Sequence, residues 1–237
     1  MTNKDALKAI MNEGRTLHSK GRHAEEYDAF ARAVRFAETF WDANDFEVFW
    51  PVLSLAMAAG EPEGGGHGRI AEVLELEQRA LRIVQVQFGE TNPWTSYVLE
   101  KTGFVFWQLG RHEEARERLE RATELFSRAN GDVKSTAYLL TMLGSLLVTM
   151  NLPAEALPYC ERALRIEEAL EQDSSRVMFG AFWVGRCLLG VGRMEEAAIQ
   201  FERALAIRIA RRPPEFKGED SRSKEFREWI AEARAKP

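Results

Sequence analysis

The chain has 237 residues, of which 45% are hydrophobic and 29% charged, and its formal net charge is −5. The negative charge argues against a nucleic-acid partner, because phosphate contacts need a basic surface. No apolar stretch approaches the length of a membrane span, and the N-terminus lacks the apolar segment of a signal peptide. These features predict a cytoplasmic protein with no nucleic-acid or membrane partner.

The first predicted element is a pair of antiparallel helices over residues 5–40. Gly14 and Gly21 are seven residues apart, and apolar positions at Phe30 and Ala33 follow at helical spacing. A second, degenerate pair is expected over residues 44–87. Pro51 is expected to interrupt its first helix, because proline removes a backbone hydrogen bond and clashes with the preceding turn.

A glycine-rich segment at residues 60–68 interrupts the second pair. Its composition predicts a flexible turn. The run Gly64–Gly68 lacks the lysine and the preceding strand of a phosphate-binding loop, so we interpret it as an insertion.

Three regular helix pairs are predicted over residues 93–129, 134–171 and 175–211. Ala115, Ala156 and Ala197 lie 41 residues apart. Two further sets obey the same period: Ala122, Ala163 and Ala204, and the mid-helix glycines Gly103, Gly144 and Gly185. A glycine inside a helix costs about 1 kcal/mol relative to alanine. We therefore expect each glycine to allow close approach of a partner helix.

The turns inside these pairs repeat as well. Gly110 and Gly192 stand where a helix ends with a positive φ angle, and Asn151 is the usual substitute for glycine there. Cys160 fills the packing position that Leu119 and Phe201 hold in the sister pairs. Together with Cys187, it is expected to be a buried thiol.

A short capping helix is predicted over residues 222–235, after Pro213 and Pro214 end the last pair. Its apolar side carries Phe226, Trp229, Ile230 and Ala233. Repeat proteins need such an element to cover the last apolar face. Five pairs and a cap account for nearly the whole chain, so residues 1–237 are expected to form a single domain.

From about residue 69 to residue 209 these repeats resemble the tetratricopeptide repeat, and more closely the 42-residue variety of kinesin light chains. The resemblance implies an all-α fold, a right-handed α-solenoid of about five helix pairs with a C-terminal capping helix. It also implies a non-catalytic scaffold or adaptor that binds a protein or peptide segment. The asparagines that kinesin-light-chain repeats use on the first helix are missing, because Glu100, Thr141 and Phe182 stand there. The family's cargo-binding mode is therefore not expected.

In such a solenoid the first helices line the concave face. The residues predicted to bind a partner there are Arg15, Trp50, Tyr97, Glu100, Phe104, Trp107, Tyr138, Thr141, Phe179, Phe182 and Arg186. His18 and Met57 are expected on the same face. Aromatic and arginine side chains are frequent interface anchors. The sequence is compatible with two arrangements of these aromatic side chains: an open groove or a tightly packed core.

No catalytic constellation is apparent, and neither a metal nor a cofactor is expected. None of the four histidines has metal-ligand spacing with another histidine, cysteine or carboxylate on the same helix. The alternative functions are a regulator that senses a peptide or other ligand through a protein partner, and self-association.

Overall fold

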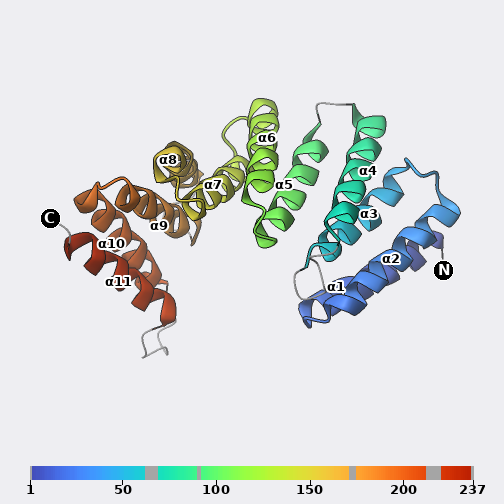
Figure 1. Cartoon of the computed structure of the whole chain (residues 1–237), viewed down its shortest axis with the longest axis horizontal. Coiled ribbons are helices and arrows are strands. Elements are labelled where there is room, and N and C mark those ends of the chain that lie inside the picture. The colour runs from blue at the N-terminus through green and yellow to red at the C-terminus, as the bar shows by residue number, and fades with distance from the viewer. Residues whose placement is uncertain (1, 62–68, 90–91, 171–174, 212–219, 236–237) are drawn as a thin grey trace. The chain divides into compact units, whose positions relative to one another are not determined.

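The computed structural model describes residues 2–61, 69–89, 92–170, 175–211 and 220–235, and all regular structure within them is helical (Figure 1). The chain divides into two compact units, Met1–Ala129 and Asn130–Pro237. The glycine run Gly64–Gly68 and the two prolines Pro213 and Pro214 lie outside the described residues.

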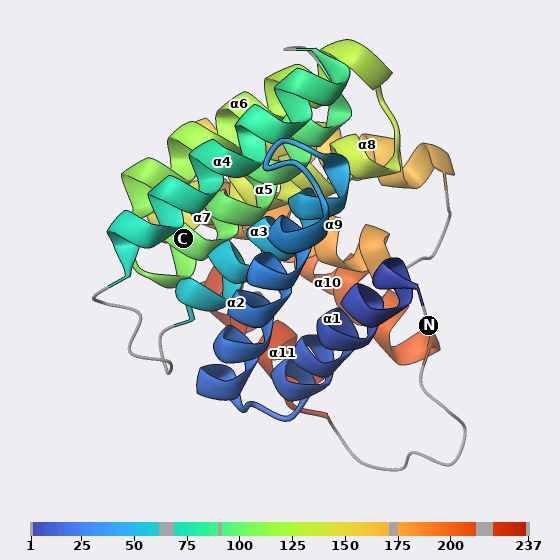
Figure 2. The same cartoon turned by 90° about the vertical axis from the view of Figure 1, so that its right-hand side faces the viewer.

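Helices that follow one another along the chain pack together in the first unit. Its helices are α1 (Asn3–Ser19), α2 (His23–Phe40), α3 (Phe46–Ala59), α4 (Ile70–Phe88), α5 (Pro93–Gln108) and α6 (His112–Asn130). Contacts join α1 to α2, α2 to α3, α3 to α4 and α4 to α5. Figures 1 and 2 both show α1 and α2 side by side, connected by a short turn.

The expected interruption at Pro51 does not occur, and that prediction is wrong. Helix α3 continues through Pro51, which is itself buried. Val48, Phe49, Val52 and Leu53 are almost completely buried beside it. Burial of so much apolar surface outweighs the roughly 3 kcal/mol that an internal proline costs a helix.

A buried ion pair joins α4 to α6 in the first unit. The Arg118 guanidinium donates through Nη2 to Glu77 Oε2 at 2.6 Å and through Nε to Glu77 Oε1 at 2.8 Å. The Thr102 hydroxyl of α5 donates to the same Glu77 carboxylate at 2.6 Å. The guanidinium carbon of Arg118 also lies over the Phe106 ring, 4.2 Å from the ring centroid. Three helices are thus tied together around one carboxylate.

The second unit continues the pattern of antiparallel helices. It contains α7 (Lys134–Thr149), α8 (Pro153–Leu170), α9 (Ser175–Gly190), α10 (Met194–Ala210) and α11 (Ser221–Ala235). Each helix packs on the next one along the chain. Phe226 of α11 is fully buried and stacks on Phe182 of α9, with ring centroids 5.3 Å apart. Trp229 stacks on Phe201 of α10 at 6.1 Å. Helix α11 therefore covers the end of the second unit.

The predicted close approach at the mid-helix glycines is confirmed in all three regular pairs. A Cβ atom on Gly103 would lie 3.1 Å from the Leu119 side chain, and one on Gly185 would lie 2.7 Å from the Phe201 ring. At Gly144 the added atom would overlap the sulfur of Cys160. The three facing side chains, Leu119, Cys160 and Phe201, differ in size, but each occupies the space that the missing Cβ of a glycine leaves.

The turn chemistry is also as predicted. Gly110, Asn151 and Gly192 have φ angles of +72°, +62° and +83°. Among the described residues, Asn151 is the one non-glycine residue with a positive φ. This conformation lets the chain reverse direction and start the second helix of each pair within a few residues.

The two cysteines are buried free thiols, as expected. Their sulfur atoms lie 3.7 Å apart, between α8 and α9. The hydrogen bond with Cys187 and burial raise the pKa of the Cys160 thiol far above its ordinary value. A thiol that stays protonated is a poor nucleophile, so Cys160 acts as a small apolar side chain.

Candidate partner-binding surface

The predicted partner-binding residues divide between the two units. Helices α1, α3 and α5 of the first unit carry six of them: Arg15, Trp50, Tyr97, Glu100, Phe104 and Trp107. Helices α7 and α9 of the second unit carry the other five: Tyr138, Thr141, Phe179, Phe182 and Arg186.

Three of these residues, from three different helices, line one cavity in the first unit. Arg15 of α1, Trp50 of α3 and Tyr97 of α5 border a cavity of about 270 Å³. The remaining lining residues are His18, Glu26, Phe30, Leu53, Ser54, Met57 and Glu61. We call this cavity the aromatic pocket. Its walls are mainly apolar, and its charged groups come from α1, α2 and the end of α3.

The aromatic rings behind the pocket brace one another. Trp50 makes edge-to-face contacts with Tyr97 at 5.7 Å, with Trp94 at 5.6 Å and with Phe49 at 5.1 Å. Such pairs add about 0.5–1.5 kcal/mol each beyond burial. Trp50 and Tyr97 are therefore held in fixed positions. Trp94, which is not among the residues predicted for the binding face, also holds Trp50 in place.

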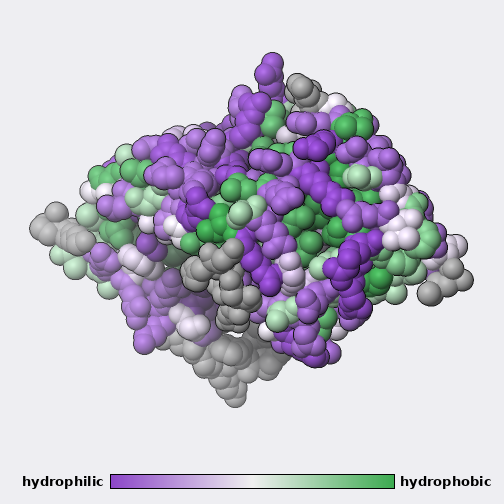
Figure 3. All heavy atoms as spheres, turned by 45° about the vertical axis from the view of Figure 1, so that its right-hand side comes forward, coloured by the Kyte–Doolittle hydropathy of each residue, from purple (hydrophilic) through white to green (hydrophobic). Residues whose placement is uncertain are grey.

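Other predicted residues of α5 lie outside the pocket. Glu100 pairs with Lys101 at 2.6 Å, and the Lys101 ammonium lies 4.9 Å from the Tyr97 ring centroid. Phe104 is 40% exposed and contacts Trp107 edge-to-face at 6.4 Å. Figure 3 shows hydrophobic residues exposed in patches among hydrophilic ones on the face that it draws.

In the second unit the predicted residues separate into exposed and packed groups. Tyr138 and Phe179 are 45% and 39% exposed, whereas Thr141 is half-buried and donates to the Ala137 carbonyl. The buried Phe182 packs under α11 and offers no surface to a partner.

Arg186 is also occupied within the unit. Its guanidinium lies 4.0 Å from the centroid of Trp229, and burial lowers its pKa. Phe182 is therefore buried away from a partner, whereas Arg186 is partly exposed but already packs on Trp229 of α11. The physical reason is that α11 docks on the side of α9 that the sequence pattern assigned to a partner.

Comparison with known proteins gives a consistent result. The family model described as tetratricopeptide repeat matches residues 67–128 and 99–169. The protein KINESIN LIGHT CHAIN-RELATED 1 of Arabidopsis thaliana is 24% identical over 139 residues, which are 58% of this chain and 23% of that protein. Residues 67–169 of this chain therefore match tetratricopeptide repeats. The chain spans about a quarter of the length of this curated relative.

Solved structures show the same fold. A putative kinesin light chain of Podosopora anserina, with nearly identical TPR-like repeats, has a TM-score of 0.73 and 17% identity, over 90% of this chain and all of that one. BtubC (BKLC) from P. vanneervenii has a TM-score of 0.73 and 20% identity, over 92% and 87% of the two chains. The predicted fold class, an all-α solenoid of helix pairs, is confirmed. Among its described helices, none is long and apolar enough to cross a membrane.

The aromatic pocket lies mostly before the matched repeats. Arg15, His18, Glu26 and Trp50 precede residue 67, where the family match begins. Tyr97 alone falls inside it. The pocket is therefore built by the degenerate part of the repeat array, which the family pattern describes least well.

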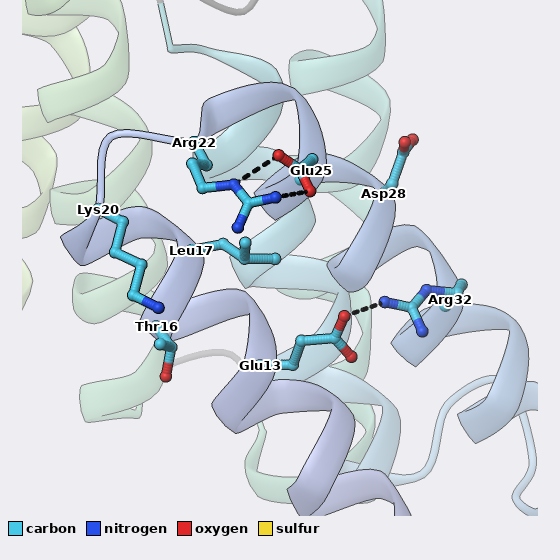
Figure 4. A pocket seen from close by; sticks show the side chains of 8 residues that line it. All are labelled: Glu13, Thr16, Leu17, Lys20, Arg22, Glu25, Asp28 and Arg32. Atoms are coloured by element: carbon cyan, nitrogen blue, oxygen red, sulfur yellow. Dashed lines mark hydrogen bonds and ion pairs between the residues drawn. The ribbon is translucent and has the colours of Figure 1, made fainter.

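A second hollow in this repeat protein lies between α1 and α2 and has a volume of about 550 Å³. Figure 4 shows its charged side chains. Arg22 is paired with Glu25, and Arg32 pairs with Glu13 at 2.7 Å. Because both arginines already bind carboxylates, this hollow is a weaker candidate for a partner than the aromatic pocket.

The histidines are arranged differently from the sequence-based expectation. The turn between α1 and α2 brings His18 next to His23 and Glu26, which lie one helical turn apart on α2. The prediction that no histidine has metal-ligand spacing with a carboxylate on its own helix is wrong for His23, because Glu26 follows it three residues later on α2. Among the described residues, His18, His23 and Glu26 form the group that could hold a metal ion.

Proposed function

We propose that this tetratricopeptide-repeat protein is a non-catalytic scaffold that binds a segment of a partner protein, with the aromatic pocket as its main anchoring site. The family resemblance supports a role in protein interaction in general. The particular site rests on the residues of this chain.

One observation carries the proposal. Arg15, Trp50 and Tyr97 are far apart in the sequence, and the repeat resemblance together with helical spacing predicts them on one face. They meet around a single cavity. A preformed cavity with fixed aromatic walls lowers the ordering cost of binding, which is the usual property of an interface anchor point.

The pocket's size and chemistry indicate its occupant. Its volume of about 270 Å³ lies below the roughly 300–1,000 Å³ of typical ligand and cofactor sites. It therefore suits one large apolar side chain of a peptide. Arg15, which is exposed beside it, would favour an acidic group next to that side chain. Phe104 and Trp107 in the first unit, and Tyr138, Thr141 and Phe179 in the second, are proposed as additional contacts.

The test is a quantitative affinity purification with mass spectrometry on three variants. Tyr97→Ala and Arg15→Glu alter the pocket, and Arg32→Glu alters the charged hollow between α1 and α2. We expect the same partners to be lost with both pocket variants and kept with Arg32→Glu, while circular dichroism shows unchanged helix content. Equal recovery of every partner by the pocket variants would refute the site.

The sensing and self-association alternatives make different predictions. A peptide sensor that acts through a protein partner would be stabilised thermally by one defined short peptide. Self-association would appear as a molecular mass that rises with concentration in light scattering. Neither alternative is favoured by a specific contact of the described residues.

A further inference from the structure

A buried glutamate occupies a position where the regular repeats carry alanine. Five residues after each turn residue, the three regular pairs have Ala115, Ala156 and Ala197, all completely buried. The first pair has Glu26 there, five residues after Gly21, and Glu26 is only 4% exposed. A buried carboxylate is costly unless it is paired or coordinates a metal. The burial of a carboxylate at this position therefore needs a chemical explanation.

Two histidines surround this carboxylate. The Nδ1 atom of His18 lies 3.1 Å from each oxygen of Glu26, and the Nδ1 atom of His23 lies 3.2 Å from Oε2. One ligand atom from each of the three residues lies within 4.8 Å of the others. His23 is mostly buried, whereas His18 is more than half exposed and open to an entering ion.

The donor set and spacing fit a zinc-type ion. Zinc binds imidazole nitrogen and carboxylate oxygen at about 2.0–2.2 Å in tetrahedral geometry, which puts neighbouring donors about 3.3–3.6 Å apart. The histidine–glutamate distances of 3.1 and 3.2 Å need to lengthen by only a few tenths of an ångström to reach this spacing. Two histidines and a glutamate are also the ligand set of zinc sites that keep one position open.

We propose that His18, His23 and Glu26 bind one divalent transition-metal ion of the zinc class at the turn between α1 and α2. His18 and Glu26 also line the aromatic pocket, so the ion borders this pocket. The metal site does not depend on the proposed function, because its ligands come from a single helix pair.

The matched control comes from the third helix pair. His112 stands at the turn position equivalent to His23, after the same Gly-Arg dipeptide, but the residue three positions later is Ala115 instead of glutamate. His112 is therefore a histidine in the same local setting without the second ligand.

The experiment is a titration of the untagged, chelator-treated chain with zinc chloride by calorimetry, with cobalt(II) absorption as a second readout. We expect one zinc per chain. His18→Ala and Glu26→Ala should each bind at least about tenfold more weakly, since loss of even an outer partner of a metal ligand typically costs 10–100-fold. His112→Ala should bind like the parent chain. Zinc should also raise the Tm of the parent but not of Glu26→Ala.

Two results would overturn the proposal: the absence of zinc binding by the parent chain, or equal affinity in the parent, His18→Ala and Glu26→Ala. The first would mean that the two imidazoles satisfy Glu26 by hydrogen bonds alone. Folding of the variants is not an obstacle, because Glu26→Ala introduces the residue of the sister repeats and His18 is exposed.

Discussion

Replacement of Arg118 by methionine tests the buried ion pair that joins α4 to α6. Methionine keeps an unbranched apolar chain at this position, but removes the guanidinium that neutralises Glu77 and lies over Phe106. The two side chains are only 13% and 5% exposed. Water therefore cannot replace the lost guanidinium.

The expected loss of unfolding free energy is about 3–5 kcal/mol, the usual cost of leaving one partner of a buried pair uncompensated. A surface pair on the same helix provides the scale for comparison. Arg121 and Glu124 are 56% and 59% exposed, so Arg121→Met should cost less than about 1 kcal/mol.

The assay is urea unfolding followed by far-ultraviolet circular dichroism, with the midpoint and slope compared between variants. The double variant Glu77→Met/Arg118→Met should recover most of the lost stability, because neither charge is then buried alone. Thr102 keeps a partner in this variant, since its hydroxyl also donates to the Val98 carbonyl at 3.0 Å. A loss below about 1 kcal/mol in Arg118→Met alone would refute the reasoning.

Two further predictions concern the second unit. Gly144→Ala should destabilise this unit by about 1–3 kcal/mol, because the added methyl group would overpack against the Cys160 sulfur. In a double-mutant cycle measured by urea unfolding, Cys160→Ala should relieve this penalty. Additive effects of the two substitutions would contradict the close approach. Partial desolvation raises the pKa of Asp220, but hydrogen bonds from Ser223 and Arg208 outweigh it and hold the pKa below the ordinary 3.8. The stability that the Asp220 carboxylate contributes is therefore present above pH 3.8 and is lost as the pH falls below this value. Acidification should lower the Tm more in the parent chain than in Asp220→Asn. Equal slopes of Tm against pH in the two proteins would contradict this prediction.

Several features followed from the sequence by itself. The 41-residue period located the helix pairs, and the mid-helix glycines indicated where two helices approach closely. Gly110, Asn151 and Gly192 fixed the turns, because few residues tolerate a positive φ angle. These features are local or strictly periodic, and helical spacing transmits them directly into structure. Helical spacing, combined with the repeat resemblance, also predicts Arg15, Trp50 and Tyr97 on one face.

Only the tertiary structure decided which apolar faces are covered. Phe182 and Arg186 share the predicted face of α9 with the exposed Phe179, yet α11 packs on both of them and buries Phe182. Pro51 lies in an unbroken helix because its neighbours are buried on several sides. His18, His23 and Glu26 meet because the turn after Ser19 folds α1 back onto α2. Spacing along one helix cannot show what packs against it, and this is the physical reason that the capped face and the histidine cluster appeared only in three dimensions.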